Sequence, residues 1–321
     1  MPPGEIEIDA VCSGPDETGL FSCSFDAYST SVVISGYYAD SALPDDPFAP
    51  FHQAVLLCRR YEFLLSRLKE GSDIWRVNHG EGALTEVSCE TFEAVASALD
   101  YCARSQGYFD ITMGAATQLW NFHIGIMPDP KTLAEAMTHV GWQNVALLKH
   151  EDGRCFVRLG DPRAVLDLGG TAKGLIADKL VELLRTAGFR GALINIGGNV
   201  AVFGGKPGGH PWRIGLNNPR DSGKPWGAVP LREGAVVTSG IYERCFTKDG
   251  KTYHHILDTS SGMPVETDLL AASVVADNAT DAEGYSTTLL SMGSVRALEY
   301  SRGIPCVQVI LMLESGEILT G

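Results

Sequence analysis

The fold prediction starts at the stretch Leu166-Asp167-Leu168-Gly169-Gly170-Thr171-Ala172-Lys173-Gly174. It places a carboxylate, two adjacent glycines and a lysine directly before a segment whose leucines and isoleucine recur at helical spacing, with Gly188 as the expected end of the helix. A helix N-terminus has unpaired backbone N–H groups and the positive end of the helix dipole, so anions bind there. The stretch therefore predicts a helix entrance that holds an anionic ligand, with Lys173 supplying positive charge.

Three further segments combine glycine turns with polar residues. Residues 192–200 predict a buried strand that runs into the Gly197-Gly198 turn. Residues 237–258 predict a strand, a hairpin with an Asp-Gly turn and a returning strand. Residues 280–288 open an apolar helix that ends near Gly293. Because no G-x-G-x-x-G motif precedes a helix, the sequence does not predict a Rossmann fold.

The pattern along the whole chain predicts the α+β class. Hairpins and runs of strands outnumber β-α-β units, so we expect a single large domain with a mixed, largely antiparallel sheet flanked by helices. Further helices are expected over residues 51–68, 88–105 and 131–140, the second with Ser88 as its N-cap. Strands are expected over residues 21–37, 155–159, 192–203, 212–216, 235–238, 252–257, 271–276 and 306–313.

The composition is that of a globular protein with a substantial core. The chain has 321 residues, of which 45% are hydrophobic, and a net charge of −14. Such an acidic chain is a poor non-specific binder of nucleic acid or anionic membrane. The sequence shows neither a secretory signal nor a segment of transmembrane length, so no membrane insertion is expected. The eight cysteines are scattered without C-x-x-C spacing, which favours a cytoplasmic protein with reduced, mostly buried thiols.

Taken in order, these segments resemble the FAD:protein FMN transferase family, also called the ApbE family. The family's motifs D-L-G-x-x-A-K-G, N-x-G-G, T-S-G-x-Y-x-R and H-I-x-D-x-x-x-G stand here at residues 167–174, 195–198, 238–244 and 255–262. Residues 66–78, 107–120 and 283–287 fit three further family motifs. The resemblance runs from about Phe25 to the C-terminal strands. Residues 1–20 are acidic and contain several Gly and Pro residues, which predicts a tail or an edge strand, and residues 21–321 are expected to form the flavin transferase domain.

The resemblance implies a Mg²⁺-dependent transferase. Such an enzyme cleaves FAD, attaches FMN through a phosphoester to a Thr or Ser of a target flavoprotein with a flavinylation motif, and releases AMP. The same site also suits an FAD pyrophosphatase that releases FMN and AMP, and a protein that binds FAD without turnover. The acceptor protein cannot be identified from the sequence.

The metal ligands implied by the resemblance are the backbone carbonyl of Gly170 and the side chains of Glu283 and Thr287. Mg²⁺ prefers oxygen ligands, and two residues four positions apart share one face of a helix. Glu283 stands where the family usually has Asp. Thr280 and Asp281 are alternative ligands if the helix entrance is shifted in register.

Three residues are expected to take part in the chemistry. Lys173 is expected to bind phosphate, and His255 to handle the proton of the acceptor or align it. Asp258 either orients His255 or closes the turn. His254 points to the opposite face of the strand and is expected to be structural. Residues 259–261 read Thr-Ser-Ser where relatives commonly have Pro-Arg-Thr, so a frequent arginine is missing.

The remaining predictions concern contacts with FAD. Asn78 occupies a position that gates the flavin pocket in relatives. Tyr28, Tyr108 and Phe109 either contact FAD or pack in the core. Arg244 pairs either with phosphate or with a carboxylate, or is solvated. The full predicted FAD-binding set is Tyr28, Asn78, Tyr108, Phe109, Asp110, Asp167, Lys173, Gly197, Gly198, Ser239, Tyr242, Arg244, His255 and Ile256.

Overall fold

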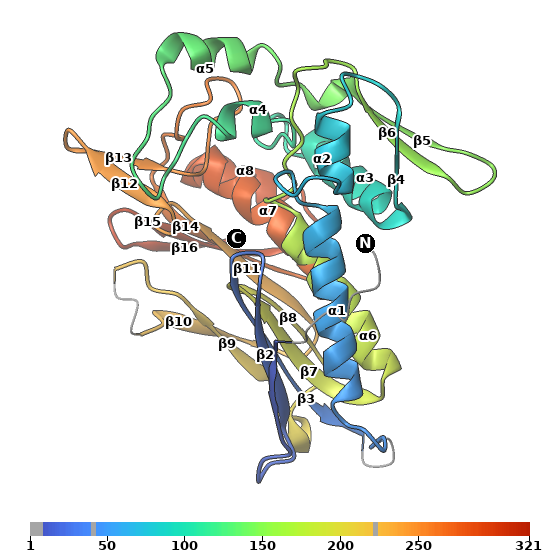
Figure 1. Cartoon of the computed structure of the whole chain (residues 1–321). Coiled ribbons are helices and arrows are strands. Elements are labelled where there is room, and N and C mark those ends of the chain that lie inside the picture. Colours follow the sequence, from blue (N-terminus) through green and yellow to red (C-terminus); the bar gives the residue numbers. More distant parts are fainter. Residues whose placement is uncertain (1–8, 40–42, 221–223) are drawn as a thin grey trace. The chain divides into compact units, whose positions relative to one another are not determined.

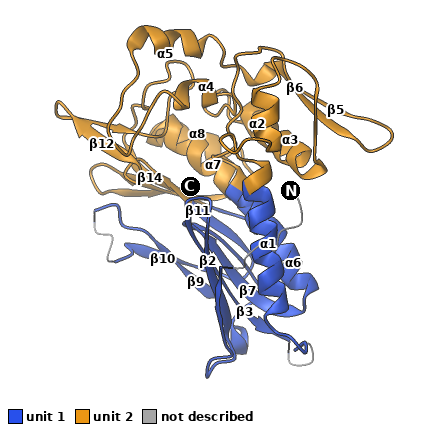
Figure 2. Ribbon diagram, viewed as in Figure 1, with its two compact units in different colours: residues 1–62, 173–237, 275–282 blue, residues 63–172, 238–274, 283–321 orange. Residues whose placement is uncertain are grey.

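The structure is a computed structural model that describes residues 9–39, 43–220 and 224–321 (Figure 1). The chain forms two compact units, coloured separately in Figure 2. Unit 1 consists of residues 1–62, 173–237 and 275–282, and unit 2 of residues 63–172, 238–274 and 283–321. The two units are described separately below.

Unit 1 is built on antiparallel strands that are neighbours in the order β1, β2, β3, β7, β8 and β11. Helices α1 and α6 lie side by side next to these strands (Figure 1). Alternating strand residues such as Val32 and Ile34 are fully buried, as are Leu180 and Leu184 of α6. The strand bounds are Val11–Ser13 (β1), Phe21–Ala27 (β2), Thr30–Tyr38 (β3), Phe189–Ile196 (β7), Asn199–Phe203 (β8) and Gly234–Gly240 (β11, of which residues 238–240 belong to unit 2). The helices are Ala49–Leu64 (α1) and Ala172–Thr186 (α6), and a hairpin pairs Trp212–Leu216 (β9) with Gly227–Leu231 (β10).

Unit 2 combines short helices with small antiparallel sheets. One sheet has three strands in the order β4, β6, β5. Strand β12 pairs with β13, and β15 pairs with β16. The helices are Asp73–Asn78 (α2), Cys89–Arg104 (α3), Gly114–Thr117 (α4), Pro130–Met137 (α5), Ala279–Met292 (α7, from Glu283 onward) and Ser294–Ser301 (α8). The strands are Thr85–Val87 (β4), Val145–Lys149 (β5), Cys155–Leu159 (β6), Cys245–Lys248 (β12), Lys251–His254 (β13), Leu269–Ala276 (β14, almost wholly in this unit), Gln308–Leu313 (β15) and Ile318–Thr320 (β16). Two 3₁₀ turns are Trp142–Asn144 (η1, unit 2) and Pro207–Gly209 (η2, unit 1).

The predicted α+β class with largely antiparallel pairing is confirmed. The helix that follows the opening stretch is α6, and Gly188 beyond its end has a φ of 89°, which an L-residue rarely adopts. The predicted cap of α3 is also present, because Ser88 accepts a hydrogen bond from the Thr91 N–H.

Three predicted strands differ from the structure. Residues 192–203 form parts of two strands, β7 and β8, because the Gly197-Gly198 turn separates them. Residues 21–37 form two strands, because Tyr28 and Ser29 both have positive φ and close a two-residue hairpin between Ala27 and Thr30. The strand predicted over 252–257 ends at His254, after which the chain turns.

The predicted edge strand within residues 1–20 corresponds to β1, and residues 1–8 lie outside the described residues. The division at residue 20 stays a prediction. Within the described part of the chain, each helix is too short or too polar to cross a bilayer.

Candidate functional site

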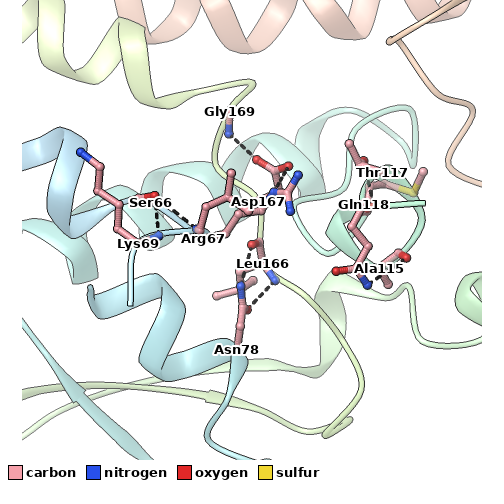
Figure 3. Close-up of polar contacts among 12 residues, drawn as sticks. Ser66, Arg67, Lys69, Asn78, Ala115, Thr117, Gln118, Leu166, Asp167 and Gly169 are labelled. Atoms are coloured by element: carbon pink, nitrogen blue, oxygen red, sulfur yellow. Dashed lines mark hydrogen bonds and ion pairs between the residues drawn. The ribbon is translucent and has the colours of Figure 1, made fainter. Parts of the chain in front are cut away.

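The carboxylate of Asp167 is fixed from two sides in unit 2 (Figure 3). Its Oδ2 accepts a hydrogen bond from Arg67 Nε at 3.0 Å, and its Oδ1 accepts one from the Gly169 N–H at 2.9 Å. The Asp167 N–H donates to the Ile111 carbonyl at 2.8 Å. The loop before α6 therefore presents Asp167 in one orientation. Arg67 was not among the predicted site residues, because a contact between residues 100 positions apart leaves no local pattern in the sequence.

Asn78, the last residue of α2, holds the same loop. Its amide accepts from the Leu166 N–H at 2.8 Å and donates to the Leu166 carbonyl at 3.0 Å, as a neighbouring strand would (Figure 3). At the other end of α2, Asp73 accepts from the Ser88 N–H and the Thr91 hydroxyl at 2.7 and 2.8 Å. Burial raises the pKa of Asp73, but these hydrogen bonds outweigh it and hold the pKa below its usual value. The structure thus connects α3, α2 and the Asp167 loop.

The predicted turn at residues 108–110 lies against this loop. A Cβ atom on Gly170 would approach the Phe109 ring to 2.8 Å, so only glycine allows the observed contact. Asp110 accepts hydrogen bonds from the Thr112 N–H and hydroxyl at 2.7 and 2.6 Å, and from the Trp142 N–H at 3.1 Å. Tyr108 is held through its hydroxyl by the guanidinium of Arg296. In this structure Phe109 and Asp110 have clear packing and turn-forming contacts.

Two predicted residues, Ser239 and Thr287, form a cluster of hydroxyl groups with Ser286 in unit 2. The Ser239 hydroxyl lies 3.1 Å from that of Thr287 and 2.8 Å from that of Ser286. Glu283 lies one helical turn before Thr287 on α7 and is only 3% exposed. Within the described residues, no group of three or more His, Cys, Asp or Glu side chains is arranged to hold a metal. A buried carboxylate one helical turn from a cluster of hydroxyls nevertheless offers the oxygen ligands that Mg²⁺ prefers, and Mg²⁺ needs few protein ligands.

The two alternative ligands begin α7 in unit 1. The Thr280 N–H and hydroxyl donate to Asp178 at 2.9 and 2.5 Å, and the Ala279 N–H donates to Asp178 at 2.8 Å. Burial raises the pKa of Asp178 against the effect of these hydrogen bonds. Asp281 and Asn278 form a reciprocal pair, with both hydrogen bonds at 2.7 Å. Both side chains are therefore engaged by protein partners, Thr280 by Asp178 and Asp281 by Asn278, in the first turn of α7.

Lys173 and Gly174 lie in the first turn of α6, in unit 1. Lys173 is half-buried, whereas Gly174 is buried. A Cβ atom on Gly174 would collide with the Ala279 carbonyl, so this glycine allows α6 to approach the start of α7.

The Gly-Gly turn joins β7 to β8 in unit 1. Asn195 closes it by accepting the Gly198 N–H at 2.8 Å, and both glycines have positive φ, 56° and 90°. A Cβ atom on Gly197 would lie 2.5 Å from the Thr30 hydroxyl. The next residue, Asn199, is 1% exposed, and its amide has no hydrogen-bond partner among the described residues. It was missed because one Asn after a turn is an unremarkable sequence feature.

Tyr28 is fixed to α1 in unit 1. Its hydroxyl donates to the Cys58 carbonyl at 2.6 Å, and its N–H donates to Glu62 at 2.8 Å. Burial raises the pKa of the Tyr28 phenol well above its ordinary value. These contacts support the core role that the sequence left open for Tyr28.

The residues after Ser239 continue in unit 2. Burial, with the nearby charge of Glu243, raises the pKa of Tyr242 to about 12, and its hydroxyl has no partner among the described residues. Arg244 is exposed, and its carbonyl accepts the His255 N–H at 3.1 Å. The structure therefore places the backbones of Arg244 and His255 side by side.

The turn after β13 shows what Asp258 does in this structure. Its Oδ1 accepts hydrogen bonds from the N–H and hydroxyl groups of Ser260 and Ser261, at 2.5 to 3.1 Å. Burial raises the pKa of Asp258, but these bonds outweigh it and lower the pKa. These contacts support the turn-closing alternative. His254 and Ile256 are buried and His255 is half-buried; burial lowers the pKa of His254, as suits a structural histidine.

The chain is similar to known proteins over most of its length. The model of the ApbE family matches residues 27–311. A protein of Treponema pallidum named FAD:protein FMN transferase is 33% identical over 290 residues, which cover 83% of this chain and 78% of that protein. A protein of Klebsiella pneumoniae with the same name is 32% identical over 303 residues, or 91% of each chain.

Solved structures show the same fold. The crystal structure of the ApbE protein from Thermotoga maritima is 28% identical, with a TM-score of 0.83 over 94% of this chain and 96% of that one. The apo flavinyl transferase ApbE of Pseudomonas stutzeri is 25% identical, with a TM-score of 0.81 over 94% of both chains. This chain belongs to the ApbE family.

Proposed function

We propose that this chain is an FAD:protein FMN transferase that requires Mg²⁺. The observation that carries the proposal is the cluster of Ser239, Ser286 and Thr287 hydroxyls one helical turn from the buried Glu283, in a chain similar over most of its length to proteins of that name. The acceptor is a flavoprotein that offers a Thr or Ser hydroxyl in a flavinylation motif.

The reaction exchanges the phosphoanhydride bond of FAD for a phosphoester bond to the acceptor. The oxygen of the acceptor hydroxyl forms a bond to the FMN phosphorus, the bond from that phosphorus to the bridging oxygen breaks, and AMP leaves with the electron pair. The acceptor gives up one proton. Mg²⁺ supplies positive charge that offsets the charge developing on the diphosphate.

Six of the predicted residues have a proposed role in this reaction. Glu283, Thr287 and the Gly170 carbonyl hold the metal, and Lys173 binds phosphate at the start of α6, where a helix N-terminus favours anions. In unit 2, Asp167 is oriented by Arg67 and Gly169 to hydrogen-bond FAD. His255 accepts the proton of the acceptor hydroxyl or aligns the acceptor. A net charge of −14 makes such local positive charge necessary for binding an anionic substrate.

The remaining FAD contacts are proposed on the resemblance alone. They are Tyr28, Asn78, Tyr108, Phe109, Asp110, Gly197, Gly198, Ser239, Tyr242, Arg244 and Ile256. The cytoplasmic location expected from the sequence is likewise a proposal, and fractionation of the source cells tests it.

Release of AMP tests the function. Incubation with FAD and Mg²⁺ should release AMP in proportion to the acceptor supplied, and excess chelator should abolish the release until Mg²⁺ is restored. AMP release that is independent of the acceptor would identify a pyrophosphatase instead. FAD binding without any AMP would identify a non-catalytic FAD-binding protein.

A further inference from the structure

Four of the eight cysteines lie in two close pairs, although all eight are free thiols in the structure. The sulfur atoms of Cys12 and Cys23 are 2.8 Å apart in unit 1, and those of Cys89 and Cys155 are 3.4 Å apart in unit 2. Among the described residues, no sulfur–sulfur contact involves the other four cysteines.

The first pair joins two neighbouring strands. Cys12 on β1 stands directly opposite Cys23 on β2 in the antiparallel register. Residues in such positions have Cα atoms about 4.5 or 5.5 Å apart. Both values fall within the roughly 4.4–6.8 Å that a disulfide spans, so the backbone needs no rearrangement.

The second pair joins the start of α3 to β6. Val87 on β4 stands opposite Cys155 on β6, and Cys89 follows Val87 by two residues as the first residue of α3. The carbonyl of Gly153 lies 3.8 Å from the sulfur of Cys89 and 3.6 Å from that of Cys155. The start of α3 and strand β6 therefore place these two thiols in contact.

We propose that Cys12 with Cys23, and Cys89 with Cys155, are two disulfide-forming sites that are oxidised by exchange with a low-molecular-weight disulfide such as oxidised glutathione. This property is independent of flavin transfer. It also departs from the expectation, drawn from the sequence, that the cysteines are reduced thiols. That expectation rests on spacing along the chain, which does not show which cysteines lie close together.

Each pair combines an accessible sulfur with a buried one. Cys12 is half-buried and Cys89 is exposed, whereas Cys23 and Cys155 are each 1% exposed. The accessible thiolate attacks the external disulfide, forms a mixed disulfide and releases one thiol. The buried partner then attacks the protein-side sulfur and releases the second thiol. Two protein thiols and one external disulfide thus give one protein disulfide and two small thiols.

Burial controls the second step. Burial, with the neighbouring sulfur in each case, raises the pKa of Cys23 and of Cys155. Because the thiolate is the attacking species, we expect closure to be faster at pH 9 than at pH 7. Burial also raises the pKa values of Cys58 and Cys102 to about 12, and these two should stay reduced.

The test uses the full chain, incubated with oxidised glutathione, denatured and alkylated. A glutamyl protease is needed for mapping, because Glu17 separates Cys12 from Cys23 whereas no Lys or Arg does. The expected products are peptides that join Cys12 to Cys23 and Cys89 to Cys155, a mass loss of two hydrogens for each bond, and a rise in melting temperature that a reductant reverses. Peptides joining other cysteines, or alkylated Cys12 and Cys23 in the oxidised chain, would overturn the assignment.

Variants separate the two sites. Cys23→Ser should leave Cys12 as a glutathione adduct and leave the Cys89–Cys155 bond intact, and Cys155→Ser should do the reverse. The matched control is Cys245→Ser, which removes an exposed cysteine outside both pairs and should leave both bonds unchanged. Loss of both bonds in any one of these variants would contradict two independent sites.

Discussion

The hydroxyl oxygens of Ser239 on β11 and Thr287 on α7 lie 3.1 Å apart. The two side chains are 48 positions apart in the sequence and meet one helical turn from the buried Glu283. Their meeting makes the proposed magnesium site a property of the fold of unit 2 rather than of one motif.

Thr287→Val tests this cluster, because it removes a hydroxyl and keeps the shape of the side chain. We expect the Mg²⁺ concentration for half-maximal AMP release to rise about 10-fold, the effect of a lost interaction worth about 1.4 kcal/mol. Thr288→Val on the adjacent position of α7 is the control, since the Thr288 hydroxyl donates to the Gly284 carbonyl at 2.8 Å. An equal Mg²⁺ requirement in the two variants would argue against Thr287 as a ligand.

The identity of the metal carboxylate can be tested by comparing Glu283 with Asp281. Glu283→Gln should raise the Mg²⁺ requirement strongly, whereas Asp281→Asn should have a smaller effect because Asp281 pairs with Asn278 at the start of α7. Glu283→Asp should retain more activity than Glu283→Gln, because it keeps a carboxylate. Magnesium titrations of all three variants decide the matter, and the opposite ranking would place the metal at Asp281.

Asn199 is expected to lower the stability of unit 1. Its buried amide lacks hydrogen-bond partners among the described residues, and an unpaired buried polar group costs about 1–3 kcal/mol. We expect Asn199→Leu to raise the melting temperature of the FAD-free chain by a few degrees. Asn195→Leu is the control and should lower it, because Asn195 closes the Gly-Gly turn. A lower melting temperature for Asn199→Leu would show that the amide stabilises the fold.

Asp73 should make stability depend on pH at the acid end. Its folded-state pKa is below the unfolded value of about 3.9, so its contribution is present above that value and is lost as the pH falls through the folded-state pKa. Asp73→Asn should therefore lower the free energy of unfolding by about 1–3 kcal/mol at pH 7 and by progressively less below pH 4. Urea unfolding at several pH values measures this. A difference between the two proteins that is constant down to pH 2 would contradict the role of the ionised carboxylate.

Substitutions of His255 and Lys173 should have different effects on catalysis and on FAD binding. His255→Ala should keep its FAD affinity and lose about 100- to 10,000-fold in transfer rate, the range for a lost acid–base group. Lys173→Ala should weaken FAD binding and slow turnover together. Calorimetric titration with FAD, melting curves and single-turnover AMP release measure these effects. If His255→Ala melts much earlier and also loses FAD binding, His255 is structural.

Local signals in the sequence predicted the parts of the fold that local chemistry determines. Ser88 caps α3, Gly188 ends the α6 region and Asn195 closes a hairpin through contacts within a few residues. The two-residue hairpin at Tyr28-Ser29 was missed, because the alternation of apolar residues continues across it and neither residue is a typical left-handed one.

The rest depends on contacts between distant segments. The ion pair between Arg67 and Asp167 and the meeting of Cys89 with Cys155 join segments 100 and 66 positions apart. A single sequence carries no local signal that two such distant residues are in contact. The family motifs predict roles in binding or catalysis for Asp258, Asp110 and Thr280, whereas the contacts in the structure show that these residues hold turns and the start of a helix.

The mass of the acceptor protein after incubation with this chain, FAD and Mg²⁺ tests the central claim most directly. The proposed function predicts that the acceptor gains one FMN, less one water, at a Thr or Ser, with one AMP released for each modified acceptor. An acceptor whose flavinylation Thr is replaced by Ala should gain nothing and release no AMP. An unchanged acceptor mass, with the chain folded and FAD bound, would contradict the assignment as a transferase.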